Sequence, residues 1–146
     1  MTVSTLGYPA RVGIPLSALI VAVIGSAVNA LIAWGGVSLG AAATGGLLPA
    51  AYIPATVVAA IGGAIGWHLI NRYARDPRRV MRWLVPAFLV LSFIPDVIVG
   101  LSLGWLVTVT LMAMHVATIT VGVTTYSRLM PLHPAGVPAP PEGSPA

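Results

Sequence analysis

Four long apolar runs dominate the chain, at residues 13–34, 49–70, 84–103 and 105–126. Each holds about 20 residues and would span ~30 Å as an α-helix, which is the thickness of the hydrocarbon core of a bilayer. The runs contain no Lys, Arg or Glu, and Asp96 is the only acidic residue in any of them. Soluble helices of this length need a charged outer face, which these runs lack. The pattern predicts an all-α integral membrane protein, an antiparallel four-helix bundle with its transmembrane domain at 13–130.

The positive charges lie on one side of the predicted spans. Residues 35–48 and 102–104, which join the first to the second run and the third to the fourth, are uncharged. All seven basic residues flank the other ends of the runs, and they are Arg11, Arg72, Arg75, Arg78, Arg79, Arg82 and Arg128. The positive-inside rule then predicts a multi-pass protein of the cell (inner) membrane with the N-terminus (1–12) and the C-terminus in the cytoplasm. Trp34, Trp83, Trp105 and Tyr126 end the predicted spans, where interfacial aromatic belts lie.

The cluster of five arginines between the second and third runs has two interpretations. It could contact anionic lipid headgroups, or it could act only as an orientation signal with side chains that snorkel to the surface. Nucleic acid is an unsuitable partner, because only 7% of the residues are charged and most of the cations lie in this one loop. Asp76 followed by Pro77 predicts an N-cap, so the third helix should begin before its apolar run.

The two ends of the chain suggest a disordered tail and a possible signal peptide. Residues 131–146 contain six prolines and should form a disordered tail, in which His133 is solvated. A cleaved signal peptide is an alternative for the first run, but that run is longer than an h-region.

Small residues recur at four-residue spacing and predict close helix packing, within the bundle or in a homo-oligomer. The predicted stripes are Ala18, Ala22, Ser26 and Ala30; Ala55, Ala59 and Gly63, with Gly62 and Gly66; and Ser92, Asp96 and Gly100.

Asp96 is the leading candidate for a functional residue, since a carboxylate near the centre of a bilayer costs ~2.5–3.5 kcal/mol on the insertion scale. Counted from the run ends, Asp96 lies ~10 Å and His115 ~15 Å from the outer edge, and Asn29 lies ~8 Å from it. Side chains lean toward the N-terminus of their own helix, so Asp96 and His115 should converge. We therefore predict a buried polar cluster of Asn29, Asp96 and His115. It would be either a proton-linked or small-ligand site, or a structural hydrogen-bond group that joins helices.

No catalytic residue, cofactor site or metal site is predicted. Met112, Met114 and His115 include soft ligand types, but Met114 should face away from the other two. His68 should lie near the inner edge, too far in depth from His115 to share a haem. The sequence contains no cysteine, no phosphate-binding loop, no nucleophile elbow and no zinc motif.

Three short segments resemble a family of small uncharacterised four-span membrane proteins of actinobacteria. They are LMAMHV at 111–116, SRL at 127–129 and SFIPD at 92–96. The resemblance covers about residues 10–130 and implies the fold and the membrane location, but no chemistry. It makes Pro95, Asp96 and His115 the first positions to mutate.

Three function classes stay open. The first is an accessory or structural membrane protein that acts by helix–helix contact, with a second copy or another membrane protein as partner. The second is a proton-linked transporter or channel subunit that uses Asp96 and His115. The third is a small membrane enzyme, which two titratable groups without a nucleophile favour least.

Overall fold

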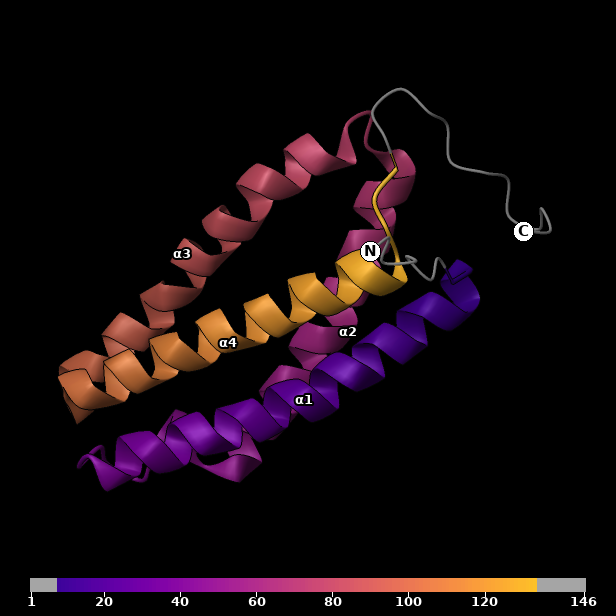
Figure 1. Ribbon diagram of the computed structural model, residues 1–146. Coiled ribbons are helices and arrows are strands. Elements are labelled where there is room, and N and C mark those ends of the chain that lie inside the picture. The colour runs from indigo at the N-terminus through magenta and orange to yellow at the C-terminus, as the bar shows by residue number, and fades with distance from the viewer. Residues whose placement is uncertain (1–7, 134–146) are drawn as a thin grey trace, which may run out of the picture.

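The computed structural model describes residues 8–133, and this part of the chain is helical, without a β-strand. The residues form α1 (Ala10–Ser38), the short 3₁₀ helix η1 (Gly45–Leu47), α2 (Pro49–Tyr73), α3 (Pro77–Leu103) and α4 (Trp105–Leu129) (Figure 1). Each α-helix is long and apolar enough to cross a membrane. The all-α prediction and the four membrane-length helices are confirmed. The prediction of a disordered tail falls mostly on residues 134–146, outside the described residues.

The helix ends follow from local sequence. The carboxylate of Asp76 accepts a hydrogen bond of 3.0 Å from the backbone N–H of Arg79, and Pro77 occupies the first helical position. This is the N-cap that the sequence predicts, and it starts α3 seven residues before its apolar run. At the other end of α3, Gly104 alone separates it from α4 with φ of +96°, which favours glycine.

The helices pack unevenly. α1 packs along both α2 and α4, whereas α3 packs chiefly on α4. Figure 1 shows α3 and α4 meeting near Gly104 and diverging toward the other end of the molecule. Only three residues of α3 are buried, namely Pro77, Met81 and Asp96, against eight of α1. α3 is therefore the helix that this chain covers least.

The buried face of α1 differs from the small-residue stripe that the sequence suggested. Among those four residues only Ala18 is fully buried. The buried positions recur every fourth residue on a neighbouring face, at Gly13, Ser17, Val21, Gly25, Asn29 and Ala33. A Cβ atom on Gly25 would lie 3.0 Å from Cγ2 of Thr56, so this glycine permits the close approach of α1 and α2.

The predicted small-residue stripes on α2 and α3 contain some residues that pack inside the bundle and others that are exposed. Gly63 packs against the Tyr126 ring and Gly100 packs against Thr108, so both serve internal contacts. In contrast, Ala55 and Ala59 are exposed, and a Cβ on Gly62 or Gly66 would meet no atom within 4 Å.

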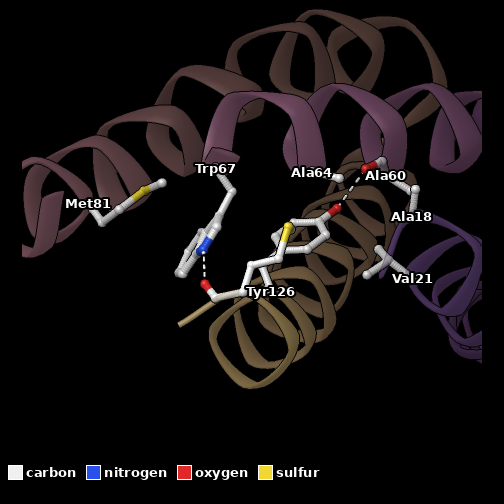
Figure 2. Packing of buried hydrophobic residues seen from close by; sticks show 8 residues of the cluster. Ala18, Val21, Ala60, Ala64, Trp67, Met81 and Tyr126 are labelled. Carbon is white, nitrogen blue, oxygen red and sulfur yellow. Dashed lines mark hydrogen bonds between the residues drawn. The ribbon is translucent and has the colours of Figure 1, made fainter. Parts of the chain in front are cut away.

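A hydrophobic cluster around Trp67 and Tyr126 contains buried side chains of all four α-helices (Figure 2). The Tyr126 hydroxyl donates a 2.7 Å hydrogen bond to the Ala60 carbonyl, and the rings of Tyr126 and Trp67 lie 5.9 Å apart. Tyr126 is buried, so its prediction as a belt residue is wrong: its hydroxyl finds a partner inside the bundle. Trp34, Trp83 and Trp105 are each more than 70% exposed.

One end of the molecule holds all seven arginines. The backbone N–H of Tyr8, just before α1, donates to the Leu129 carbonyl at the end of α4. The end of α2 bonds to the residues after α4, and a short loop joins α2 to α3. The start of α1, the α2–α3 loop and the end of α4 therefore lie together, and we call this the arginine end.

Candidate functional site

Asp96 and His115 meet between α3 and α4. The Oδ2 atom of Asp96 lies 2.8 Å from Nδ1 of His115. The approach depends on Gly100, one turn along α3, where any side chain would collide with Thr108 of α4. The depth and the lean of these two side chains, read from the sequence, anticipate this pairing.

The pair is buried on one side and open on the other. The Asp96 side chain is 6% exposed, whereas the His115 side chain is 38% exposed. His115 Nδ1 also lies 3.1 Å from the Leu111 carbonyl, with which it forms its hydrogen bond. Oδ2 of Asp96 lies within ion-pair distance of the ring but forms no hydrogen bond in the described part of the chain. Within residues 8–133, Nε2 of the ring forms no hydrogen bond. A histidine and a carboxyl group at this distance can exchange a proton, and the exposed flank leaves the ring open to an outside partner.

Asn29 belongs to a different hydrogen-bonded group. Its Nδ2 donates bonds of 3.0 Å to the hydroxyl oxygens of Thr56 and Thr118, so one amide joins α1, α2 and α4. The Thr56 hydroxyl in turn donates to the Tyr52 carbonyl at 2.7 Å. Asn29 is 3% exposed, and its Oδ1 is buried with no hydrogen-bond partner in the described part of the chain. In the structure, hydrogen bonds therefore do not link Asn29 to Asp96 or His115.

Sequence reasoning missed Thr56. It lies seven residues after the start of α2 and Asn29 lies five residues before Trp34, so both lie at a similar depth, ~8–10 Å from the same edge. It is also the only threonine or serine of α2. A search for hydroxyl groups at the depth of Asn29 would have found it.

A second polar site at the arginine end was also missed. The Trp67 indole Nε1 donates to the Met130 carbonyl at 2.8 Å. The Asn71 side chain donates from Nδ2 to the Pro131 carbonyl at 3.1 Å and accepts at Oδ1 from the His133 backbone N–H at 3.0 Å. We call residues 130–133 the strap. The sequence predicts that residues 131–133 belong to the disordered tail, with His133 solvated, but Pro131 and His133 bond to Asn71 of α2.

The predicted lipid-contact arginines lie at the surface of the arginine end. All five are exposed, and the Arg72 guanidinium carbon lies 5.6 Å from the centroid of the Tyr73 ring. Within residues 8–133, no group of three or more His, Asp or Glu side chains could hold a metal ion.

Comparison with known proteins places the chain in a family. Residues 8–132 match the model of a family of unknown function, DUF6069. No curated protein and no solved structure matches the chain. The matched region covers all four helices together with Asp96, His115 and almost the whole strap, so the chain belongs to the DUF6069 family.

Proposed function

We propose that this protein is a small multi-pass protein of the inner membrane, with both termini in the cytoplasm, that acts by helix–helix contact as an accessory or structural subunit. The observation that carries the proposal is the half-exposed His115 beside the buried Asp96. A polar ring open to hydrocarbon has no water to bond with, so an unpaired ring nitrogen is costly there. A partner helix that covers the α3–α4 flank removes this cost.

The exposure of α3 supports the same proposal. Apart from Asp96, its buried side chains lie at the arginine end, and the rest of the helix presents Phe88, Leu91 and Ile98 outward. Lipid alone would suit these apolar side chains but not the neighbouring imidazole. A second copy of the chain or another membrane protein would satisfy both.

Cysteine crosslinking tests the proposal directly, since the chain has no native cysteine. Val116→Cys places a thiol beside His115, and Val58→Cys places one on the exposed surface of α2 as a matched control. In native membranes Val116→Cys should form a crosslinked dimer, or a heterodimer whose partner mass spectrometry identifies, while Val58→Cys stays monomeric. His115→Ala should weaken the crosslink. An uncrosslinked Val116→Cys in native membranes would contradict the proposal.

The 2.8 Å contact between Asp96 and His115 favours one alternative, a proton-linked transporter or channel subunit. Proteoliposomes with a pH-sensitive dye inside test it. The wild-type protein should dissipate an imposed pH gradient, and both Asp96→Asn and His115→Ala should slow the dissipation while the helical CD spectrum stays unchanged. Wild-type vesicles that hold the gradient as long as empty vesicles exclude this alternative.

We also propose that the five-arginine cluster around the α2–α3 loop, which consists of Arg72, Arg75, Arg78, Arg79 and Arg82, contacts anionic lipid headgroups. Arginines near a charged surface contribute about 1 kcal/mol each, so replacing Arg78 and Arg79 with Gln should lower the thermal stabilisation by phosphatidylglycerol relative to phosphatidylcholine. Arg11→Gln is the control outside the five-arginine cluster. Equal stabilisation of the wild-type protein by the two lipids would contradict the proposed lipid contact. The cluster would then act only as an orientation signal.

A further inference from the structure

The strap is recognised through its backbone. Two residues of α2, four positions apart, meet three backbone groups of the strap. Trp67 Nε1 donates to the Met130 carbonyl, and the Asn71 amide donates to the Pro131 carbonyl and accepts from the His133 N–H. An asparagine side chain has the same donor and acceptor as a peptide unit. Here it pairs with a carbonyl and with the N–H two residues later, as a neighbouring strand does when it adds to an extended peptide.

The composition of the strap suits this kind of recognition. Pro131 has no backbone N–H, so the strap leaves one donor fewer to satisfy beside the bundle. Proline also restricts the residue before it to extended conformations, which reduces the conformational entropy that binding removes.

The side chains of the strap contact the apolar core of the arginine end. Met130 is 6% exposed, and it packs against Gly13 of α1. A Cβ atom on Gly13 would lie only 3.0 Å from Cγ of Met130, so the glycine leaves room for the methionine side chain. Leu132 packs against the cluster that contains Trp67 and Met81. The strap is thus held by α1 and α2 and packs in the cluster that α3 joins.

Met81 makes this cluster important for α3. Along the half of α3 nearest the arginine end, the buried residues are Pro77 and Met81, and α3 has few contacts with α2. Figure 2 shows the Met81 side chain extending from α3 toward the Trp67 ring, whose indole N–H bonds to the strap. The contacts that hold Trp67 and Leu132 in place therefore also stabilise the position of this end of α3.

We propose that Trp67 and Asn71 form a binding site for extended peptide backbone, that residues 130–133 of the same chain occupy it, and that this occupancy latches the arginine end of α3 to the bundle. Loss of the strap from the site exposes Trp67 and frees α3 to swing about its packed end at Gly100. The latch is independent of Asp96 and His115, which lie in the other half of the α3–α4 pair.

Hydrogen exchange of the full chain in lipid nanodiscs tests the occupancy. The His133 amide reports on it, because its N–H donates to Asn71. Asn71→Ala removes both amide bonds and should speed exchange of this amide about tenfold or more. Asn71→Asp keeps the acceptor for His133 but loses the donor to Pro131, and should have an intermediate effect. Exchange in the centre of α4 should stay unchanged, which shows that the variants fold.

Distance measurement tests the latch. Spin labels at Val80 of α3 and Ser127 of α4, both exposed, report on the separation of the two helices at the arginine end. The wild-type distribution should be narrow, and Asn71→Ala and Trp67→Phe should broaden and shift it. An unchanged His133 exchange rate in Asn71→Ala would show that the site does not hold the strap. A faster rate with an unchanged distance distribution would show that the strap does not hold α3, and either result overturns the proposal.

Discussion

Asn29 offers the sharpest test of how this bundle is held together. One buried amide bonds a hydroxyl on α2 and a hydroxyl on α4, so it joins three helices. The informative changes are Asn29→Ala, which removes both bonds, and Thr118→Val, which removes one and conserves shape. Thr120→Val is a matched control, since the Thr120 hydroxyl is exposed and bonds only the Val116 carbonyl of its own helix.

The expected magnitude depends on the state to which the bundle unfolds. In a bilayer that state is a set of separated helices that remain inserted, where the unpartnered Oδ1 of Asn29 is as poorly satisfied as in the bundle. The cost of the unpartnered Oδ1 is therefore the same in both states and does not contribute to the free energy of unfolding. Only the two interhelical hydrogen bonds of Nδ2 contribute. Such bonds average ~0.6 kcal/mol in membranes with a maximum of ~1.7, so Thr118→Val should destabilise by ~0.6 kcal/mol. Asn29→Ala should destabilise by about 1–3 kcal/mol, because it also empties space between three packed helices.

Reversible unfolding in bicelles, followed by helical CD or by steric trapping, measures these differences. A double-mutant cycle between Asn29→Ala and Thr118→Val should give a coupling energy close to the loss in Thr118→Val alone. Thr120→Val should be neutral within about 0.5 kcal/mol. A vanishing coupling energy, or an Asn29→Ala variant as stable as wild type, would refute the view that this amide holds the three helices together.

Three further changes test other contacts, each by the same unfolding measurement. Gly100→Ala should destabilise by about 1–3 kcal/mol because its methyl group collides with α4, whereas Gly62→Ala, which faces open space, should not destabilise. Tyr126→Phe should lose about 1 kcal/mol, since its hydroxyl gives up a buried bond to an α2 carbonyl. Asp76→Ala should cost about 0.5–2 kcal/mol and Asp76→Ser much less, because serine also caps a helix; equal losses would show that the cap adds nothing.

The parts of the fold that depend on position along the chain were predictable. Apolar runs of fixed length predict the four helices, and Asp76 before Pro77 predicts where α3 begins. Depth along two helices, together with the lean of side chains, predicts that Asp96 approaches His115. All of these inferences use distance along a helix axis, which the sequence states directly.

The parts that depend on rotation about a helix axis were not predictable. A soluble helix shows its buried face by a change from apolar to polar residues, but in a membrane both faces are apolar. The stripe on α1 was therefore placed on a face beside the buried one, and Asn29 was grouped with Asp96 at similar depth although it bonds Thr56 and Thr118. The strap was missed for another reason. Most of it belongs to the proline-rich segment 131–146, whose composition is typical of disorder, and the residues that hold it lie about 60 positions earlier in the chain.

The single-residue link at Gly104 has a consequence for biogenesis. With one residue between them, α3 and α4 are too closely joined to enter a bilayer one after the other. If the protein lies in the membrane as proposed, they should insert as a preformed hairpin. Asp96 would then enter hydrocarbon already beside His115. The free-energy cost of insertion would therefore be lower than for an isolated carboxylate. Lengthening this link with a flexible glycine–serine segment should uncouple the two insertions and lower the yield of integrated protein. Asp96→Leu should restore that yield.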